Sequence, residues 1–177
     1  ALPADFERRL GANQGFLDRL HAIKRDKLSA ADQIDYDLFE FMVDARVRFA
    51  KFREWRTPLN SDSGFHVEVL QMHEYADTQS VSGYEHYIAR LKDVPRYFRE
   101  NIANMRQGLA DGWTLPGAIL DGVASIIAGE QVKAPEEFPL YAPFKSFPDR
   151  IGEPDRALLA TVGRAAILEA INPANAD

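Results

Sequence analysis

Residues 80–128 read SVSGYEHYIARLKDVPRYFRENIANMRQGLADGWTLPGAILDGVASIIA and organise the rest of the chain. Steps of three and four residues separate most of the apolar positions, which is the spacing of a buried helical face. Gly112 favours a helix end, and Thr114 and Pro116 favour the cap and first turn of a second helix. The stretch therefore predicts a long helical hairpin. Its buried positions are predicted at Tyr84, Tyr87, Ile88, Leu91, Val94, Phe98, Ile102, Met105, Leu109, Leu115, Ile119, Leu120, Val123, Ile126 and Ile127.

Two polar positions and one proline bear on the first arm of this hairpin. Ser80 is a good N-cap for it. Pro95 lies inside the helical pattern, where a proline removes a backbone donor. Either one helix kinks at Pro95, or two helices meet there and Asp93 caps the second.

Four further segments predict helices, over residues 2–23, 29–56, 65–75 and 156–171. Gly11 and Gly15 weaken the first and allow a break in it. Ser29 is a good N-cap for the second, which is the longest uninterrupted pattern. Inward positions are predicted at Ile34, Leu38, Phe41, Met42, Ala45, Phe49, Phe52 and Trp55 in the second helix, and at Leu158, Leu159, Val162, Ala166, Ile167 and Ile171 in the last.

Residues 131–154 combine prolines with aromatic side chains. The segment is too apolar for a free linker, so we expect an ordered loop whose aromatic side chains enter helix grooves. A proline-rich ligand for a small adaptor domain is the alternative. Together the elements predict an all-α fold: an antiparallel array of about five to seven helices around the long hairpin, in a single domain over residues 1–177.

Composition narrows the classes of function. The net charge of −6 and the pI of about 5.3 argue against a general nucleic-acid binder, which needs a basic surface. The absence of cysteine excludes thiol catalysis and zinc–thiolate sites in this chain. No apolar run approaches the roughly 20 residues of a membrane span, so none is expected. No signal peptide is visible, and both cytoplasm and periplasm remain open, since a leader can be removed.

Charge is segregated along the second predicted helix. Acidic residues occupy its first half and basic residues its second, an order that complements the helix dipole. Asp44 and Arg48 are spaced for an ion pair. The basic end is either an anion site or a solvated helix end. The residues concerned are Asp32, Asp35, Asp37, Glu40 and Asp44, then Arg46, Arg48, Lys51, Arg53 and Arg56.

The densest group of metal-ligand types is His66, Glu68, His73 and Asp77. The two histidines are seven residues apart, two turns along one helical face. His73-Glu74 begins the zinc motif His-Glu-x-x-His, but Asp77 stands where the second His belongs. The alternative to a metal site is a half-buried helix whose histidines are satisfied by hydrogen bonds.

Other chemical motifs are absent or weak. Asp35 with Asp37 and Glu136 with Glu137 are paired carboxylates, but nothing in their setting suggests raised pKa values. No G-x-S-x-G elbow and no phosphate-cradling glycine loop occurs. Trp113 is either a core anchor or a ligand platform. The sequence therefore assigns no catalytic, cofactor-binding or metal-binding residue with a recognisable motif.

An ordered set of short segments nevertheless resembles the bacterial domain of unknown function 885 family. The set spans almost the whole chain, and its members are structural markers, specific by their order and not catalytic. They are Leu28-Ser29, Ile34 to Leu38, Pro58-Leu59 with Gly64, Tyr87 to Leu91 with Val94-Pro95, Gly108 with Gly112 to Pro116, Ser146-Phe147-Pro148, and Ala170 to Ala174.

Members of this family look like gluzincin-type zinc peptidases, so the resemblance implies a function for the parent protein. It implies a longer bacterial protein whose zinc motif and downstream Glu ligand lie beyond this chain, which carries no family catalytic residue. The chain would then be a non-catalytic N-terminal helical scaffold and one wall of the substrate cleft. Its partners would be the remainder of its own polypeptide and a peptide substrate. Many members look exported or lipid-anchored. The alternative, from the charge segregation and the aromatic loop, is a self-contained helical module that binds a partner helix or an anion.

Overall fold

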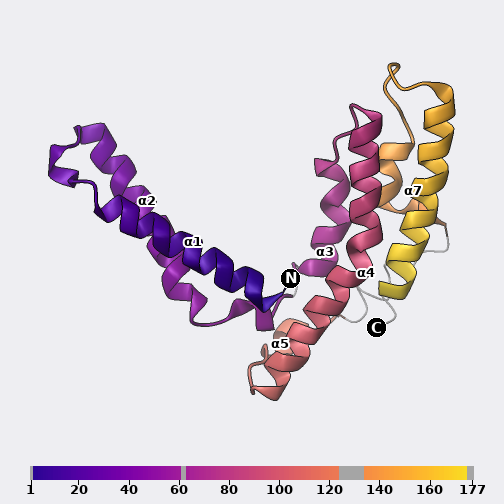
Figure 1. Cartoon of the computed structure of the whole chain (residues 1–177). Coiled ribbons are helices and arrows are strands. Elements are labelled where there is room, and N and C mark those ends of the chain that lie inside the picture. Colours follow the sequence, from indigo (N-terminus) through magenta and orange to yellow (C-terminus); the bar gives the residue numbers. More distant parts are fainter. Residues whose placement is uncertain (1, 61–62, 124–133, 175–177) are drawn as a thin grey trace. The chain divides into compact units, whose positions relative to one another are not determined.

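The computed structural model describes residues 2–60, 63–123 and 134–174, the last four of these as backbone only (Figure 1). The chain is all-α, as predicted, and the described ranges contain no strand beyond one isolated bridge between Leu59 and Gly64. It divides into two units, Ala1–Arg56 and Thr57–Asp177, each taken by itself below. The expectation of a single domain stays a prediction.

The first unit is an antiparallel helical hairpin. Helix α1 runs without a break through both of its glycines, and Ser29 caps α2 by accepting a hydrogen bond from the Asp32 amide at 3.2 Å. Between the helices, Arg25 forms a two-pronged ion pair with Asp37, with both N–O distances 2.6 Å. The elements are α1 (Pro3–His21), η1 (Arg25–Lys27), α2 (Ala30–Ala50) and η2 (Glu54–Arg56).

Helix α2 is shorter than predicted. It ends at Ala50, where the sequence pattern continues to Arg56. Arg53 has a φ of +50°, in the left-handed region that an α-helix cannot contain. The last basic residues of the predicted helix therefore lie in a turn and in η2, and they do not continue the face of α2.

The second unit is built on α4 and α7, which pack against each other, and α4 continues beyond the end of α7 (Figure 1). The predicted helix at 65–75 is present as α3 followed by a tighter 3₁₀ turn. The elements are α3 (Phe65–Leu70), η3 (Gln71–Tyr75), α4 (Val81–Ala110), α5 (Gly117–Leu120), η4 (Pro135–Glu137), η5 (Pro139–Phe144) and α7 (Glu153–Ala174).

Helix α4 begins and ends where its sequence indicates. Ser80 accepts a hydrogen bond from the Gly83 amide at 3.0 Å, and the helix continues through Pro95 as one element. At its end, the amides of Gly112 and Trp113 donate to the carbonyls of Leu109 and Gly108 at 3.1 and 2.8 Å. These two bonds and the φ of +71° at Gly112 form a Schellman motif, which explains the glycine.

The second arm of the predicted hairpin differs from expectation. Helix α5 has four residues, and Pro116, not Thr114, occupies its N-cap position. Asp121 has left the helical region, so α5 does not continue as a long arm from Leu115 to Val123. The predicted inward residues Ile126 and Ile127 lie outside the described residues.

Aromatic side chains of the proline-rich segment fill the space between α4 and α7. Phe138, Leu140 and Phe144 are buried in the core, as an ordered loop requires, and this packing disfavours a free proline-rich ligand. The buried hydroxyls of Tyr84 and Tyr87 donate to the carbonyls of Pro143 and Leu140 at 2.8 and 2.9 Å. The segment is thus held to α4 by hydrogen bonds as well as by apolar contact.

The direction of α7 departs from the predicted antiparallel array. Arg150, just before α7, donates to the side chain of Gln79, just before α4. The two helices therefore start side by side and run in the same direction (Figure 1). In the described residues before α7, both η4 and η5 pack against α7, and η5 also packs against η3.

Candidate functional site

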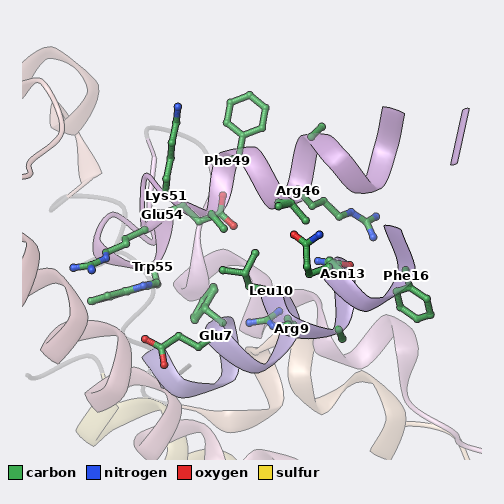
Figure 2. Close-up of a pocket in the computed structure, with 18 residues that line it drawn as sticks. Glu7, Arg9, Leu10, Asn13, Phe16, Arg46, Phe49, Lys51, Glu54 and Trp55 are labelled. Atoms are coloured by element: carbon green, nitrogen blue, oxygen red, sulfur yellow. The ribbon is translucent and has the colours of Figure 1, made fainter. Parts of the chain in front are cut away.

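A groove lies between α1 and the C-terminal half of α2, entirely within the first unit (Figure 2). Residues between Phe6 and Phe16 form one side, and residues between Ala45 and Trp55 form the other. Its volume is about 1280 Å³. We call it the hairpin groove.

Small residues explain why the two helices leave this space. Gly11 and Ala12 on α1 and Ala45 and Ala50 on α2 line the groove, and none has a side chain long enough to fill it. Figure 2 shows Leu10 between the two helices. The lining contains both apolar and polar side chains, as is usual for ligand sites. The apolar side chains are Phe6, Leu10, Phe16, Val47, Phe49 and Trp55.

The charge of the hairpin groove is positive although the whole chain is acidic. Four cationic and two acidic side chains line it, a net charge of +2 (4 − 2). Of these, the Arg9 guanidinium lies 4.4 Å from the centre of the Phe6 ring and the Lys51 ammonium 5.0 Å from that of Phe52. A ligand with an apolar body and negative charge would suit both properties. The charged residues are Arg9, Arg46, Lys51, Arg53, Glu7 and Glu54.

Only three of the five basic residues predicted at the end of the second helix lie on one surface. Arg46, Lys51 and Arg53 line the hairpin groove. Arg48 pairs with Asp44 at 2.8 Å, the ion pair that their spacing predicts. Arg56 donates to the carbonyl of Phe52 at 3.1 Å. Sequence spacing found these cations, but it could not show that small residues of α1 and α2 open a groove beside three of them.

Most of the predicted buried stripe of α2 is exposed, so this prediction is wrong for all but its half-buried members Ala45 and Trp55. The face of α2 that packs on α1 contains Val43, the buried residue of this helix. Five large apolar residues elsewhere on the helix are exposed, and Phe41 retains 69% of its accessible surface. Ala45 lies in line with them and is half-buried, and Ala45 and Phe49 also line the end of the hairpin groove. Beyond the helix, Phe52 is also exposed and Trp55 is half-buried. We call the six residues the outer stripe: Ile34, Leu38, Phe41, Met42, Ala45 and Phe49.

The residues of the metal hypothesis do not form a ligand set. Among the described residues, no group of three His, Asp or Glu side chains is placed to hold a metal ion. His73 contacts the carbonyl of Leu70 at 2.7 Å, and Asp77 accepts from the Gln79 amide at 2.9 Å. The helix also changes from α to 3₁₀ at Gln71, so the two predicted turns along one α-helical face are not formed.

His66 is nonetheless unusual. It is buried, with 3% of its surface exposed, and its Nδ1 atom has no hydrogen-bond partner. Burial lowers the pKa of His66 below 6.5, because the charged imidazolium loses its hydration. Nearby, Glu68 accepts from the Tyr97 hydroxyl at 3.3 Å. His66 is therefore a neutral core side chain at pH 7.

Two carboxylates, one from each pair considered in the sequence, have lowered pKa values. A hydrogen bond from Arg25 lowers the pKa of Asp37, and one from Arg164 at 2.5 Å lowers that of Glu136. Lowered values keep both groups ionised, which does not suit a general acid. Trp113 is 41% exposed beside the end of α4 and is not a core anchor.

Comparison with known proteins places the chain in a family. The family model described as "Bacterial protein of unknown function (DUF885)" matches residues 2–177. The chain belongs to the DUF885 family. No curated protein and no solved structure matches it.

The DUF885 match covers both units, so the hairpin groove and the α4–α7 core lie within one family region. Its description assigns no chemistry to any residue. None of the described helices combines the length and the apolar character that a membrane span requires.

Proposed function

We propose that this chain is the non-catalytic N-terminal helical region of a zinc-dependent peptidase, serving as scaffold and as one wall of the substrate cleft. Membership of the DUF885 family supports the proposal, together with the resemblance of that family to gluzincin-type peptidases. Zinc is assigned to no residue here, since the described His, Asp and Glu side chains form no ligand set.

The hairpin groove is the observation that supports a role as one wall of the substrate cleft. Its apolar lining residues suit the apolar side chains of a peptide, and its net positive charge suits acidic side chains. Three of its four cations follow Ala45, so an acidic side chain would be bound near the C-terminal end of α2. We therefore expect substrates with apolar residues next to Asp or Glu.

The first test is the coding sequence after the codon for Asp177. The proposal expects a His-Glu-x-x-His motif and a further Glu downstream of it. A stop codon directly after Asp177 would overturn the peptidase proposal.

The second test uses the full polypeptide. Lys51→Glu reverses a charge in the hairpin groove and should raise KM for an acidic peptide about tenfold, with zinc content and kcat unchanged. Lys24→Glu is the matched control, because Lys24 is exposed and does not line the groove. An equal KM in both variants would contradict the wall function. Peptide hydrolysis by residues 1–177 alone would contradict the non-catalytic role.

A self-contained binding module is the second candidate function. The hairpin groove lies wholly within residues 1–56, so it needs no other part of the chain for binding. Inorganic phosphate or a short poly-glutamate peptide should then raise the melting temperature of residues 1–177. The rise should be lost in Lys51→Glu and kept in Lys24→Glu. Melting temperatures that neither probe changes would count against this candidate.

A further inference from the structure

The outer stripe of α2 has an order that reads the same from either end. Its members are separated by steps of 4, 3, 1, 3 and 4 residues, from Ile34 to Phe49. Its midpoint lies between Phe41 and Met42. All six positions are within α2, so they share one rigid helical face.

A stripe with this symmetry brings its own members together when two copies of the helix pair antiparallel. Consider an antiparallel pair of helices related by a two-fold axis through this midpoint. Two residues then meet across the axis when the sum of their numbers is 83. Ile34 then meets Phe49, Leu38 meets Ala45, and Phe41 meets Met42. Each large side chain thus faces another member of the stripe, which is how the same patch on two copies becomes complementary.

Charges beside the outer stripe favour the same orientation. Asp35 and Arg46 lie along one flank, and Asp37 and Arg48 along the other, each pair 11 residues or about three turns apart. A two-fold axis brings each flank against the same flank of the second copy. Asp35 then lies beside Arg46 of that copy, offset by two residues or about 3 Å along the axis, within the reach of an arginine. A parallel pair would instead bring like charges together.

Two of these charged groups are available for pairing between copies. Within the described part of the chain, neither Asp35 nor Arg46 has an ion-pair partner. Asp37 and Arg48 already pair with Arg25 and Asp44 on the surface of their own hairpin. We therefore expect Asp35 and Arg46 to contribute most to the orientation.

We propose that two copies of this chain associate through the outer stripe, with their α2 helices antiparallel about a two-fold axis. The two hairpins then form a four-helix layer in the order α1, α2, α2, α1, which covers the exposed apolar surface. The pairing does not rest on the peptidase proposal. Four members of the outer stripe do not line the hairpin groove, and Ala45 and Phe49 at its end do.

Sedimentation of residues 1–177 tests the association. The expected species is a dimer of 39.8 kDa (2 × 19.9). Phe41→Asp should raise the dissociation constant at least about tenfold, since each dimer loses two central apolar contacts. Leu158→Asp is the matched control, an exposed apolar side chain on α7, and should change it less than about twofold. A monomer at all concentrations up to about 100 µM would overturn the proposal.

Charge reversal tests whether Asp35 of one copy lies beside Arg46 of the other. Asp35→Arg and Arg46→Asp should each weaken the dimer, because each sets like charges against one another. The double variant, which exchanges the two charges, should restore dimerisation. If the double variant is as weak as the sum of the single changes, the proposed facing is wrong.

Disulfide trapping tests the antiparallel order, and the chain has no natural cysteine to interfere. A mixture of Leu38→Cys and Ala45→Cys chains should oxidise to mixed dimers. Either variant alone should not, since identical positions lie seven residues or about 10 Å apart along the axis, too far for a disulfide. Efficient cross-linking of Leu38→Cys alone would show a parallel pair and overturn the orientation.

Discussion

At the residue scale, close packing against Phe144 explains why α7 contains a glycine. A Cβ atom at Gly163 would lie 2.3 Å from Cζ of the buried Phe144 ring. Gly163→Ala should therefore lower the free energy of unfolding by about 1–3 kcal/mol, the usual cost of overpacking. Gly117→Ala is the control, with no atom within 4 Å of its new Cβ, and should change stability by less than about 0.5 kcal/mol. Urea unfolding followed by circular dichroism measures both, and equal values would contradict the packing argument.

Because His66 is buried, we expect the free energy of unfolding to depend on pH in the acid range. Burial lowers the pKa of His66 in the folded chain below the ordinary 6.5, so the unfolded chain binds more protons once the pH falls through 6.5. The free energy of unfolding should then fall as the pH is lowered below 6.5, and His66→Asn should reduce this slope. Unfolding in urea at several pH values between about 5 and 8 measures it. His86→Asn, at an exposed position on α4, should keep the full slope. An unchanged slope in His66→Asn would show that other groups cause the acid sensitivity.

At the element scale, helix caps formed by side chains agree with local sequence rules. Ser80→Ala removes the hydrogen bond to the Gly83 amide and should cost about 1 kcal/mol. Ser82→Ala, two residues further on in the first turn of the same helix and exposed, should instead be neutral or stabilising by up to about 0.5 kcal/mol, because alanine is the better helix former. The difference between the two urea midpoints isolates the cap. A Ser80→Ala variant as stable as Ser82→Ala would contradict its role.

Positions of the helices could be predicted because they depend on neighbours in sequence. The first helix was predicted over residues 2–23 and is observed at Pro3–His21, and the cap at Ser29 and the glycine end at Gly112 are also as predicted. The end of α2 could not be predicted, because the residue with left-handed backbone angles is Arg53. Glycine or asparagine at that position would have indicated such a turn, and arginine does not. The predicted second arm is too long over residues 115–123, because apolar spacing alone does not distinguish a short helix from a long one.

At the scale of the whole molecule, apolar burial is unequal between the two units. Leu17 and Val43 are the buried hydrophobic residues described in the first, whereas the second contains the main core cluster around α4 and α7. We therefore expect residues 57–177 to unfold in one sharp thermal transition when expressed alone. Residues 1–56 alone should melt broadly at low concentration, because hairpins with little burial are marginal. Thermal circular dichroism of the two pieces checks this, and a sharp transition in the shorter piece at low concentration would contradict it.

The sequence by itself determined the helical class of this protein, most helix positions, the caps at Ser29 and Ser80, and the family. These properties follow from hydrogen bonds and side-chain spacing within a few residues of one another. Only the tertiary structure decided which face of α2 meets α1, that α7 runs in the same direction as α4, and that small residues open the hairpin groove. An apolar stripe indicates that a helix face favours burial, but its partner depends on where the chain brings the next element. Most of the outer stripe of α2 remains exposed in the described hairpin, and we propose that a second copy covers it.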